Sequence, residues 1–155
     1  SKGYIDKEYR KKMDNRLWGC DTCQQVCPHN KEAKKGNHPE FRPQILEAYP
    51  KLLSLLKLSN KDYKEKFKIT PMNWRGKRPI QRNAAIILGN LKQREAIPHL
   101  IDALDDPKPI VRAHSVWALA EIGERSILDE LKGMLLREKD KQVIAELEQA
   151  IEKLE

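Results

Sequence analysis

The chain has 155 residues, 39% of them hydrophobic and 34% charged, with a formal net charge of +7. This length allows one or two small domains, and no stretch has the pattern of a membrane span or a signal peptide. Residues 1–83 carry 20 Lys and Arg against 9 Asp and Glu, whereas residues 84–155 carry 10 against 14. The basic half predicts a polyanionic partner, nucleic acid rather than a membrane surface. A generally basic surface would give the same count.

Residues 6–17 predict a short helix, because Tyr9, Met13 and Leu17 recur every four residues on one face. The first residue is Ser1 rather than a methionine, as expected of a fragment or a processed chain. A loop that contains all three cysteines of the chain follows this segment.

The cysteines stand in the pattern C-x2-C-x3-C-P, at Cys20, Cys23 and Cys27. This spacing is typical of the tail of a bacterial iron–sulfur run, in which Leu17 occupies the place of the first cysteine. Because the cysteine before proline ligates the other cluster in two-cluster proteins, we expect Cys20 and Cys23 to share one cluster and Cys27 to reach a second. Two cubane clusters need eight thiolates, so the chain is expected to be incomplete and to hold a cluster poorly alone.

Two alternatives remain for these thiols. They could form a zinc site with His29 or His38 as the fourth ligand, or they could be inert buried thiols. An odd number of cysteines within eight residues argues against a disulfide framework, which indicates a reducing, cytoplasmic compartment.

Residues 28–43 contain three prolines and read as an irregular linker. Residues 45–58 are apolar and predict a partly helical segment. Ser59 is a candidate N-cap for a helix over residues 60–67, where Tyr63 and Phe67 form an i, i+4 pair.

The stretch 70–83 combines cations with an aromatic residue and an amide. Arginine and lysine contact phosphates, and a tryptophan can stack on an unpaired base. We also expect the last two residues of the stretch to open the first repeat helix, whose N–H groups favour phosphate. The candidate RNA contacts are Trp74, Arg75, Lys77, Arg78, Arg82 and Asn83. The alternative is a basic surface loop with its tryptophan packed in the core.

Residues 78–155 repeat with a period of 31 to 32, so that residues 80–91 align with residues 111–122. Each unit predicts two helices joined by a short turn, and such units bury their apolar faces by stacking. His99 and His114 fall in these helices and are expected on a helix surface or in the core. The predicted fold is mostly α, with a partial ferredoxin-like segment (1–43), a helical connector with the basic loop (44–77) and HEAT-like repeats forming an α-solenoid (78–155).

Three segments together resemble one known family: GCDTCQQVCP at 19–28, WRGK at 74–77 and RNAAIILGN at 82–90, followed by the repeats. The chain is similar over essentially its whole length to the C-terminal half of epoxyqueuosine reductases. The combination of the cysteine run with the third segment is much more specific than either alone.

The resemblance implies an oxidoreductase that reduces epoxyqueuosine to queuosine at the wobble position of tRNA. It implies two [4Fe-4S] clusters, with Cys20, Cys23 and Cys27 among their ligands, and cobalamin bound by a catalytic part that lies N-terminal to this segment. It implies that the repeats and the basic stretch dock a tRNA with a queuosine-type anticodon. The segment alone would then contain no catalytic residue and be inactive.

Two other functions fit the residues. The chain could be a ferredoxin-like electron-transfer protein whose repeats bind a protein partner, or a zinc-stapled scaffold without a redox role. For the reductase, we expect a monomer that receives electrons from an unidentified donor.

Overall fold

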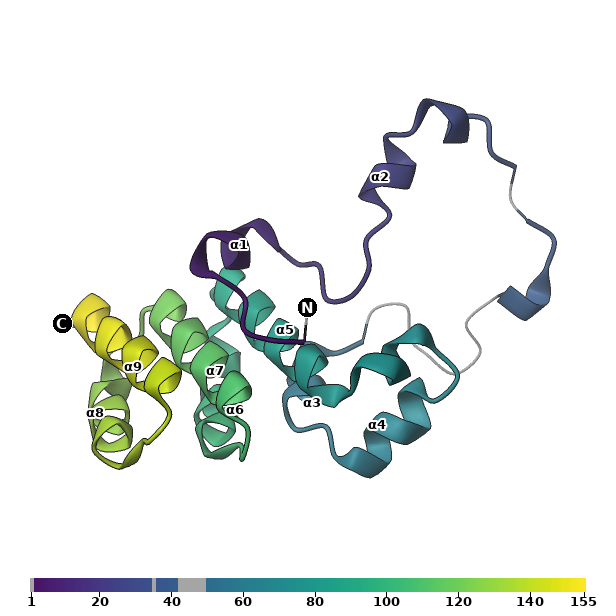
Figure 1. The fold of residues 1–155 in the computed structure, drawn as a ribbon. Coiled ribbons are helices and arrows are strands. Elements are labelled where there is room, and N and C mark those ends of the chain that lie inside the picture. The colour runs from purple at the N-terminus through teal and green to yellow at the C-terminus, as the bar shows by residue number, and fades with distance from the viewer. Residues whose placement is uncertain (1, 35, 42–49) are drawn as a thin grey trace.

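The structure is a computed structural model that describes residues 2–34, 36–41 and 50–155. In these ranges the regular structure is helical, without strands (Figure 1). The α-helices are α1 (Lys7–Lys12), α2 (Thr22–Gln25), α3 (Leu52–Leu56), α4 (Asn60–Phe67), α5 (Lys77–Asn90), α6 (Ile97–Asp102), α7 (Pro109–Ile122), α8 (Leu128–Arg137) and α9 (Lys141–Leu154). The 3-10 helices are η1 (Pro28–Asn30), η2 (Pro39–Phe41), η3 (Pro71–Arg75), η4 (Arg94–Ala96), η5 (Ala103–Asp105) and η6 (Arg125–Ile127). No described helix is long and apolar enough to cross a membrane.

The repeats form stacked helix pairs, as the sequence period predicts. Figure 1 shows α5, α7 and α9 in a row, with α6 and α8 along one side of it. The row is tightly packed at Gly89 of α5, where a Cβ atom would lie 2.8 Å from Ala118 Cα and 3.0 Å from the Trp117 ring. Small residues at this crossing therefore let α5 and α7 approach closely.

Ion pairs join each repeat to the next. Arg78 of α5 donates to both carboxylate oxygens of Asp106, at 2.9 and 2.6 Å. One repeat later, Arg112 of α7 makes a bidentate contact with Glu138, in which Nε and Nη2 each donate to one carboxylate oxygen at 2.8 Å. Hydrogen bonds from Arg112 lower the pKa of Glu138 to about 2. These pairs fix the stacking of successive repeats through groups that are mostly shielded from water.

The predicted helix over residues 6–17 is shorter than expected. It is helical as α1, and residue Asp14 beyond it has a φ of 52°. The predicted apolar face is also wrong in part: Tyr9 is 50% exposed, whereas Arg10 is buried. The reason is that α1 lies on the repeats, where the Trp117 ring of α7 and the Glu146 carboxylate of α9 receive Arg10. Met13 and Leu17 still pack against the core.

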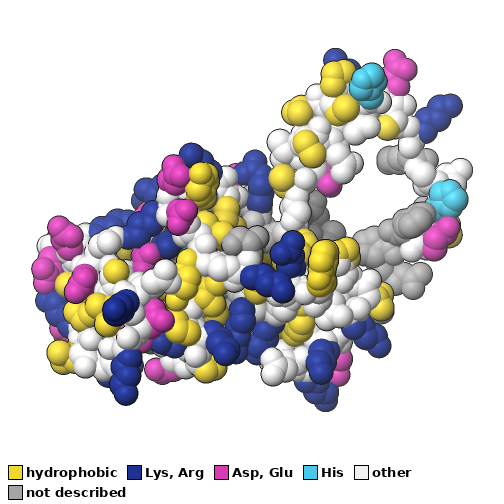
Figure 2. Space-filling model, viewed as in Figure 1, with side chains coloured by type: hydrophobic (Ala, Val, Ile, Leu, Met, Phe, Trp, Pro, Cys, Tyr) yellow, Lys and Arg dark blue, Asp and Glu magenta, His cyan; other side chains and the backbone are white. Residues whose placement is uncertain are grey.

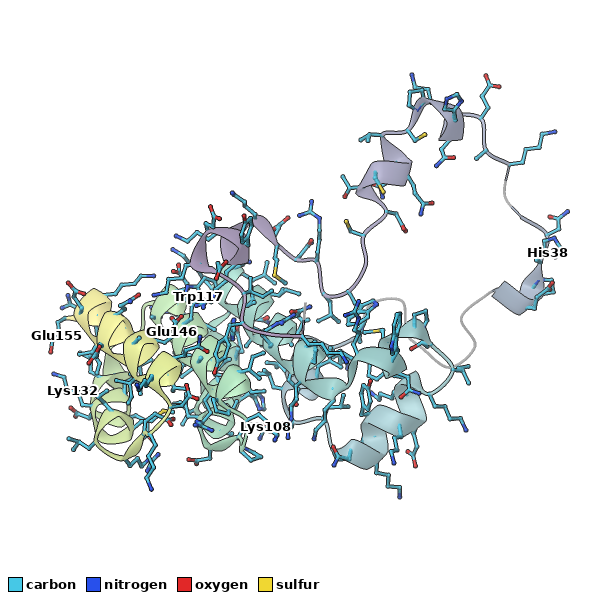
Figure 3. The ribbon with its side chains drawn as sticks, viewed as in Figure 1. His38, Lys108, Trp117, Lys132, Glu146 and Glu155 are labelled. Carbon is cyan, nitrogen blue, oxygen red and sulfur yellow. The ribbon has the colours of Figure 1, made fainter. Side chains whose placement is uncertain are left out.

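Residues 2–18, here called the N-terminal strap, lie along the repeats and are held by polar contacts. Arg10 is 3% exposed; its Nη2 donates to Glu146 Oε1 of α9 at 2.7 Å, and its guanidinium lies 5.4 Å from the Trp117 ring centre. Figure 3 labels Trp117 and Glu146 on neighbouring helices beneath α1. The backbone N–H of Ile5 donates to Nε2 of His114 at 3.3 Å. These contacts therefore anchor the strap to α7 and α9, at residues distant in sequence.

The connector matches the sequence prediction closely in α4. The Ser59 hydroxyl accepts a hydrogen bond from the Asp62 N–H at 3.0 Å, which caps the helix, and the Tyr63 and Phe67 rings lie 5.5 Å apart in the core. The preceding helix α3 covers only part of the predicted segment, whose residues 45–49 lie outside the described ranges. The described parts of the linker 28–43 hold only the short turns η1 and η2.

Candidate functional site

The cysteine loop extends away from the helical body (Figure 1). Cys20 and Cys23 are exposed, and Cys27 is half-buried. Hydrogen bonds from the backbone and the hydroxyl of Thr22 lower the pKa of the Cys20 thiol, and Arg16 adds to this effect. At Cys20 the loop therefore favours the thiolate, the form that binds metals.

These thiols suit iron–sulfur chemistry better than a closed zinc site. Within the described ranges, no group of three or more His, Cys, Asp or Glu side chains could hold one metal ion. In this structure His29 and His38 are not grouped with the thiols, and the three thiols are not grouped with one another. Thiolates are the preferred ligands of iron–sulfur clusters, and the exposed sulfur atoms of Cys20 and Cys23 are open to further ligands. The donor set fits cluster binding.

The basic loop presents one exposed aromatic platform. Trp74 in η3 is 77% exposed, and the Arg75 guanidinium lies 5.1 Å from its ring centre. The loop is fixed from behind, because the buried Tyr63 hydroxyl donates to the Met72 carbonyl at 2.8 Å. Gly76, with a φ of 83°, then turns the chain into α5. Trp74 is thus not packed in the core, and its ring is available for stacking.

Two further predicted RNA contacts are half-buried and already engaged. Lys77 Nζ donates to the Leu58 carbonyl at 2.9 Å, and burial lowers its pKa. Arg78 is bound to Asp106, which neutralises its charge locally. These two side chains are therefore less free than Arg75 to bind a phosphate.

Arg82 and Asn83 do not open a helix, contrary to the prediction. The helix α5 begins at Lys77, and both residues lie in its buried middle. Arg82 donates to the Asn83 side-chain oxygen and to the Gly3 carbonyl, and Asn83 Nδ2 donates to the Leu17 carbonyl at 2.7 Å. Burial lowers the pKa of Arg82 to about 10. In this structure these side chains hold the N-terminal strap.

His114 is fully buried, as one of the two predicted alternatives for it required. Its Nδ1 faces the Ile110 carbonyl at 2.7 Å and its Nε2 accepts from Ile5, so the neutral ring satisfies both contacts. Burial, aided by the neighbouring charge of Arg10, lowers its pKa to about 3. This histidine therefore serves the core rather than a metal site.

The sequence analysis missed the cation and aromatic ring that precede the cysteines. Arg16 and Trp18 line an open groove together with Cys20 and Arg75. Arg16 and Trp18 pair a cation with an aromatic residue, as Trp74 and Arg75 do, and this pattern could have predicted the groove residues. The four exposed lysines in and beside α4 were also missed, and Figure 2 shows Lys and Arg side chains over this region: Lys61, Lys64, Lys66 and Lys68.

Two known families match the chain. Residues 1–30 match the 4Fe-4S double cluster binding domain, and residues 76–152 match HEAT repeats. Among curated proteins, the chain is 44% identical over 155 residues to epoxyqueuosine reductases of Bacillus anthracis and Bacillus subtilis. It is 47% identical to an uncharacterized protein in the gldA 3' region of Geobacillus stearothermophilus, of which it covers 72%.

Solved structures agree in fold. An epoxyqueuosine reductase with an epoxyqueuosine-modified stem loop of tyrosine tRNA matches with a TM-score of 0.93 and 44% identity, over 99% of this chain and 41% of that chain. The reductase of Streptococcus thermophilus matches with a TM-score of 0.85 and 39% identity, over 99% of this chain and 41% of that one.

The cysteine loop and the stacked helix pairs define a protein with an iron–sulfur segment joined to HEAT repeats. The chain belongs to the epoxyqueuosine reductase family. The match to the Bacillus anthracis reductase includes 99% of this chain but only 41% of the length of that protein.

Proposed function

We propose that this chain is the C-terminal part of a tRNA-modifying oxidoreductase that reduces epoxyqueuosine to queuosine. In this proposal it supplies iron–sulfur ligands and a docking surface for the RNA. The observation that carries the proposal is the 0.93 TM-score match to a reductase with a tRNA stem loop, over 99% of this chain. The exposed Trp74–Arg75 platform supports it independently.

The three thiols divide between two clusters in this proposal. Cys20 and Cys23 would hold one cluster and Cys27 a second, because the cysteine before proline serves the other cluster in two-cluster domains. When bound, such clusters pass single electrons. The chain supplies three of the eight thiolates that two cubanes require, so the remaining ligands belong to the longer protein. In this proposal the longer protein also binds cobalamin and carries out catalysis. We expect the chain alone to be inactive.

The RNA contact centres on Trp74 and Arg75. A base of an unpaired loop would stack on the exposed ring, which is sequence-tolerant and contributes about 1–3 kcal/mol per base. Arg75 would bind the adjacent phosphate, with Lys77 and Arg78 adding positive field at the start of α5. Arg82 and Asn83 would contribute indirectly, by holding the strap that leads to the cysteines. The longer protein would act as a monomer in a reducing cytoplasm and receive electrons from a separate donor.

A titration with two stem-loop RNAs tests the proposal. One RNA carries a queuosine-type anticodon and the other does not, and both are titrated at two salt concentrations. We expect preference for the first, and we expect Trp74→Ala to weaken the binding of both RNAs about 5- to 150-fold through lost stacking. Leu136→Ala is the matched control, because Leu136 is an exposed apolar residue of α8. Equal, weak binding of both RNAs would contradict the proposal and favour an electron carrier with a protein partner.

A further inference from the structure

A groove beside the cysteine loop has walls from two parts of the chain that are far apart in sequence. The strap and the start of the cysteine loop form one wall, and η3 with α5 forms the other. The groove has a volume of about 370 Å³ and is open to solvent. Its lining residues are Arg16, Leu17, Trp18, Gly19, Cys20, Arg75, Arg82 and Asn83.

The groove is lined by cations and by no acidic residue. Arg16 is exposed, and its Nη1 donates to the Lys12 carbonyl at 3.3 Å. Within the described part of the chain, neither Arg16 nor Arg75 has a carboxylate within ion-pair distance. Other grooves differ: the one between α3 and α6 includes Asp102, Asp105 and Asp106. The groove beside Cys20 is therefore suited to an anion.

The surroundings favour a phosphodiester over a protein carboxylate. Arginine binds carboxylate and phosphate alike through two parallel N–H bonds, so Arg16 and Arg75, which line the groove from its two walls, do not distinguish them. Arg75 also lies on the exposed ring of Trp74, so a stacking surface for a base lies next to the anion site. Cations interleaved with exposed aromatic rings are the usual arrangement for single-stranded nucleic acid.

We propose that this groove binds one phosphodiester of the RNA backbone, held between Arg16 and Arg75. The inference rests on the proposed function and adds a specific contact to it. Arg16 lies four residues before Cys20 on the same segment. A phosphate at Arg16 therefore sets the distance between the RNA loop and the cluster ligands, and the groove aligns the substrate with the cysteine loop as well as adding affinity.

The test compares two Arg→Gln variants of the chain in a stem-loop RNA titration. Arg16→Gln removes a groove charge from an exposed side chain, so the thermal unfolding temperature should not change. Arg94→Gln is the control, because Arg94 is an exposed arginine beyond the far end of α5. We expect Arg16→Gln to weaken binding about 5- to 20-fold and to reduce the salt slope by about one, whereas Arg94→Gln changes neither.

A set of RNAs, each with one neutral methylphosphonate linkage, locates the contact. At the linkage that occupies the groove, the penalty of Arg16→Gln should disappear, because the partner charge is already gone. Equal affinities of the Arg16→Gln and Arg94→Gln variants would overturn the groove contact, while sensitivity to Trp74→Ala would keep the proposed function. If the unmodified chain binds no stem-loop RNA, both proposals fail for this chain.

Discussion

Arg82 and Asn83 use their polar groups to hold another part of the same chain. They donate to the carbonyls of Gly3 and Leu17, and Asn90 of the same helix donates to the carbonyls of Arg10 and Asp14. Gly3 and Leu17 lie outside α1, so their carbonyls have no helical partners, and buried carbonyls need donors. These three side chains of α5 supply donors to the strap, which accounts for the buried Arg82 and Asn83 in the middle of the helix.

His114 should make stability depend on pH. Its pKa is about 3 in the folded chain against 6.5 as the ordinary value. The unfolded chain therefore binds the proton first, and the stabilisation that is complete above pH 6.5 is lost as pH falls toward 3. We expect the free energy of unfolding to fall by up to about 1.4 kcal/mol per pH unit below pH 6.

Urea unfolding at a series of pH values between 7 and 5 measures this slope, since most carboxylates stay ionised there. His114→Gln is the comparison: it should be less stable throughout but should lose most of the slope. An unchanged slope in this variant would mean that another group carries the pH dependence.

Gly89 is the position where an added methyl group should be most harmful. The Cβ of Gly89→Ala would meet the Ala118 backbone at 2.8 Å. Overpacking typically costs about 1–3 kcal/mol, against about 1 kcal/mol gained in helix propensity. We expect a net loss of up to about 2 kcal/mol, measured by chemical denaturation. Gly133→Ala in α8 is the control, because nothing lies within 4 Å of its Cβ, and it should stabilise the chain by about 0.5–1 kcal/mol.

At the scale of elements, the strap is held to α9 by one buried ion pair. Glu146→Ala would leave the Arg10 guanidinium buried without its carboxylate, which typically costs about 3–5 kcal/mol. We expect faster hydrogen exchange in residues 5–17, because the strap would detach more often. Glu148→Ala is the control, since Glu148 is exposed on the same helix. Similar exchange in both variants would show that the ion pair does not anchor the strap.

The helix pairs and α4 could be predicted from the sequence because their signals are local. A serine before an amphipathic turn acts within one turn. The 31-residue period is visible in the sequence because each repeat contacts mainly its neighbours. The docking of the strap could not be predicted in this way. It depends on contacts between residues 3–17 and residues 82–146, and on polar side chains that have no periodicity. Arg82 therefore looked like a phosphate ligand, although it is buried.

The candidate site was predicted unevenly for the same reason. The cysteine spacing is a local motif, and the family match over residues 1–30 agrees with it. Trp74 and Arg75 stay predictions for RNA binding, with an exposure that suits the role. The groove beside Cys20 is formed by residues 16–20 together with residues of η3 and α5. The sequence alone could not place Arg16 and Arg75 in one groove, because these segments are far apart in the chain.

At the scale of the whole molecule, the positive charge lies in the first 83 residues, and the later repeats are acidic overall. RNA binding through the basic half should release counterions from about four phosphates. We expect affinity to fall about 50- to 150-fold as salt rises from about 50 to about 200 mM. Isothermal titrations at four salt concentrations check this slope, and a flat response would contradict an interface built on phosphate contacts.

The long-range anchoring of the strap also has a consequence for the order of folding. The Ile5–His114 and Arg10–Glu146 contacts span 109 and 136 residues. Helical repeats fold through near-neighbour contacts and need not wait for such closures. A ribosome must therefore deliver nearly the whole chain before the strap can dock fully. Until then the strap is not held against the repeats, so iron and sulfide supplied during synthesis meet a cysteine loop whose orientation is not yet fixed.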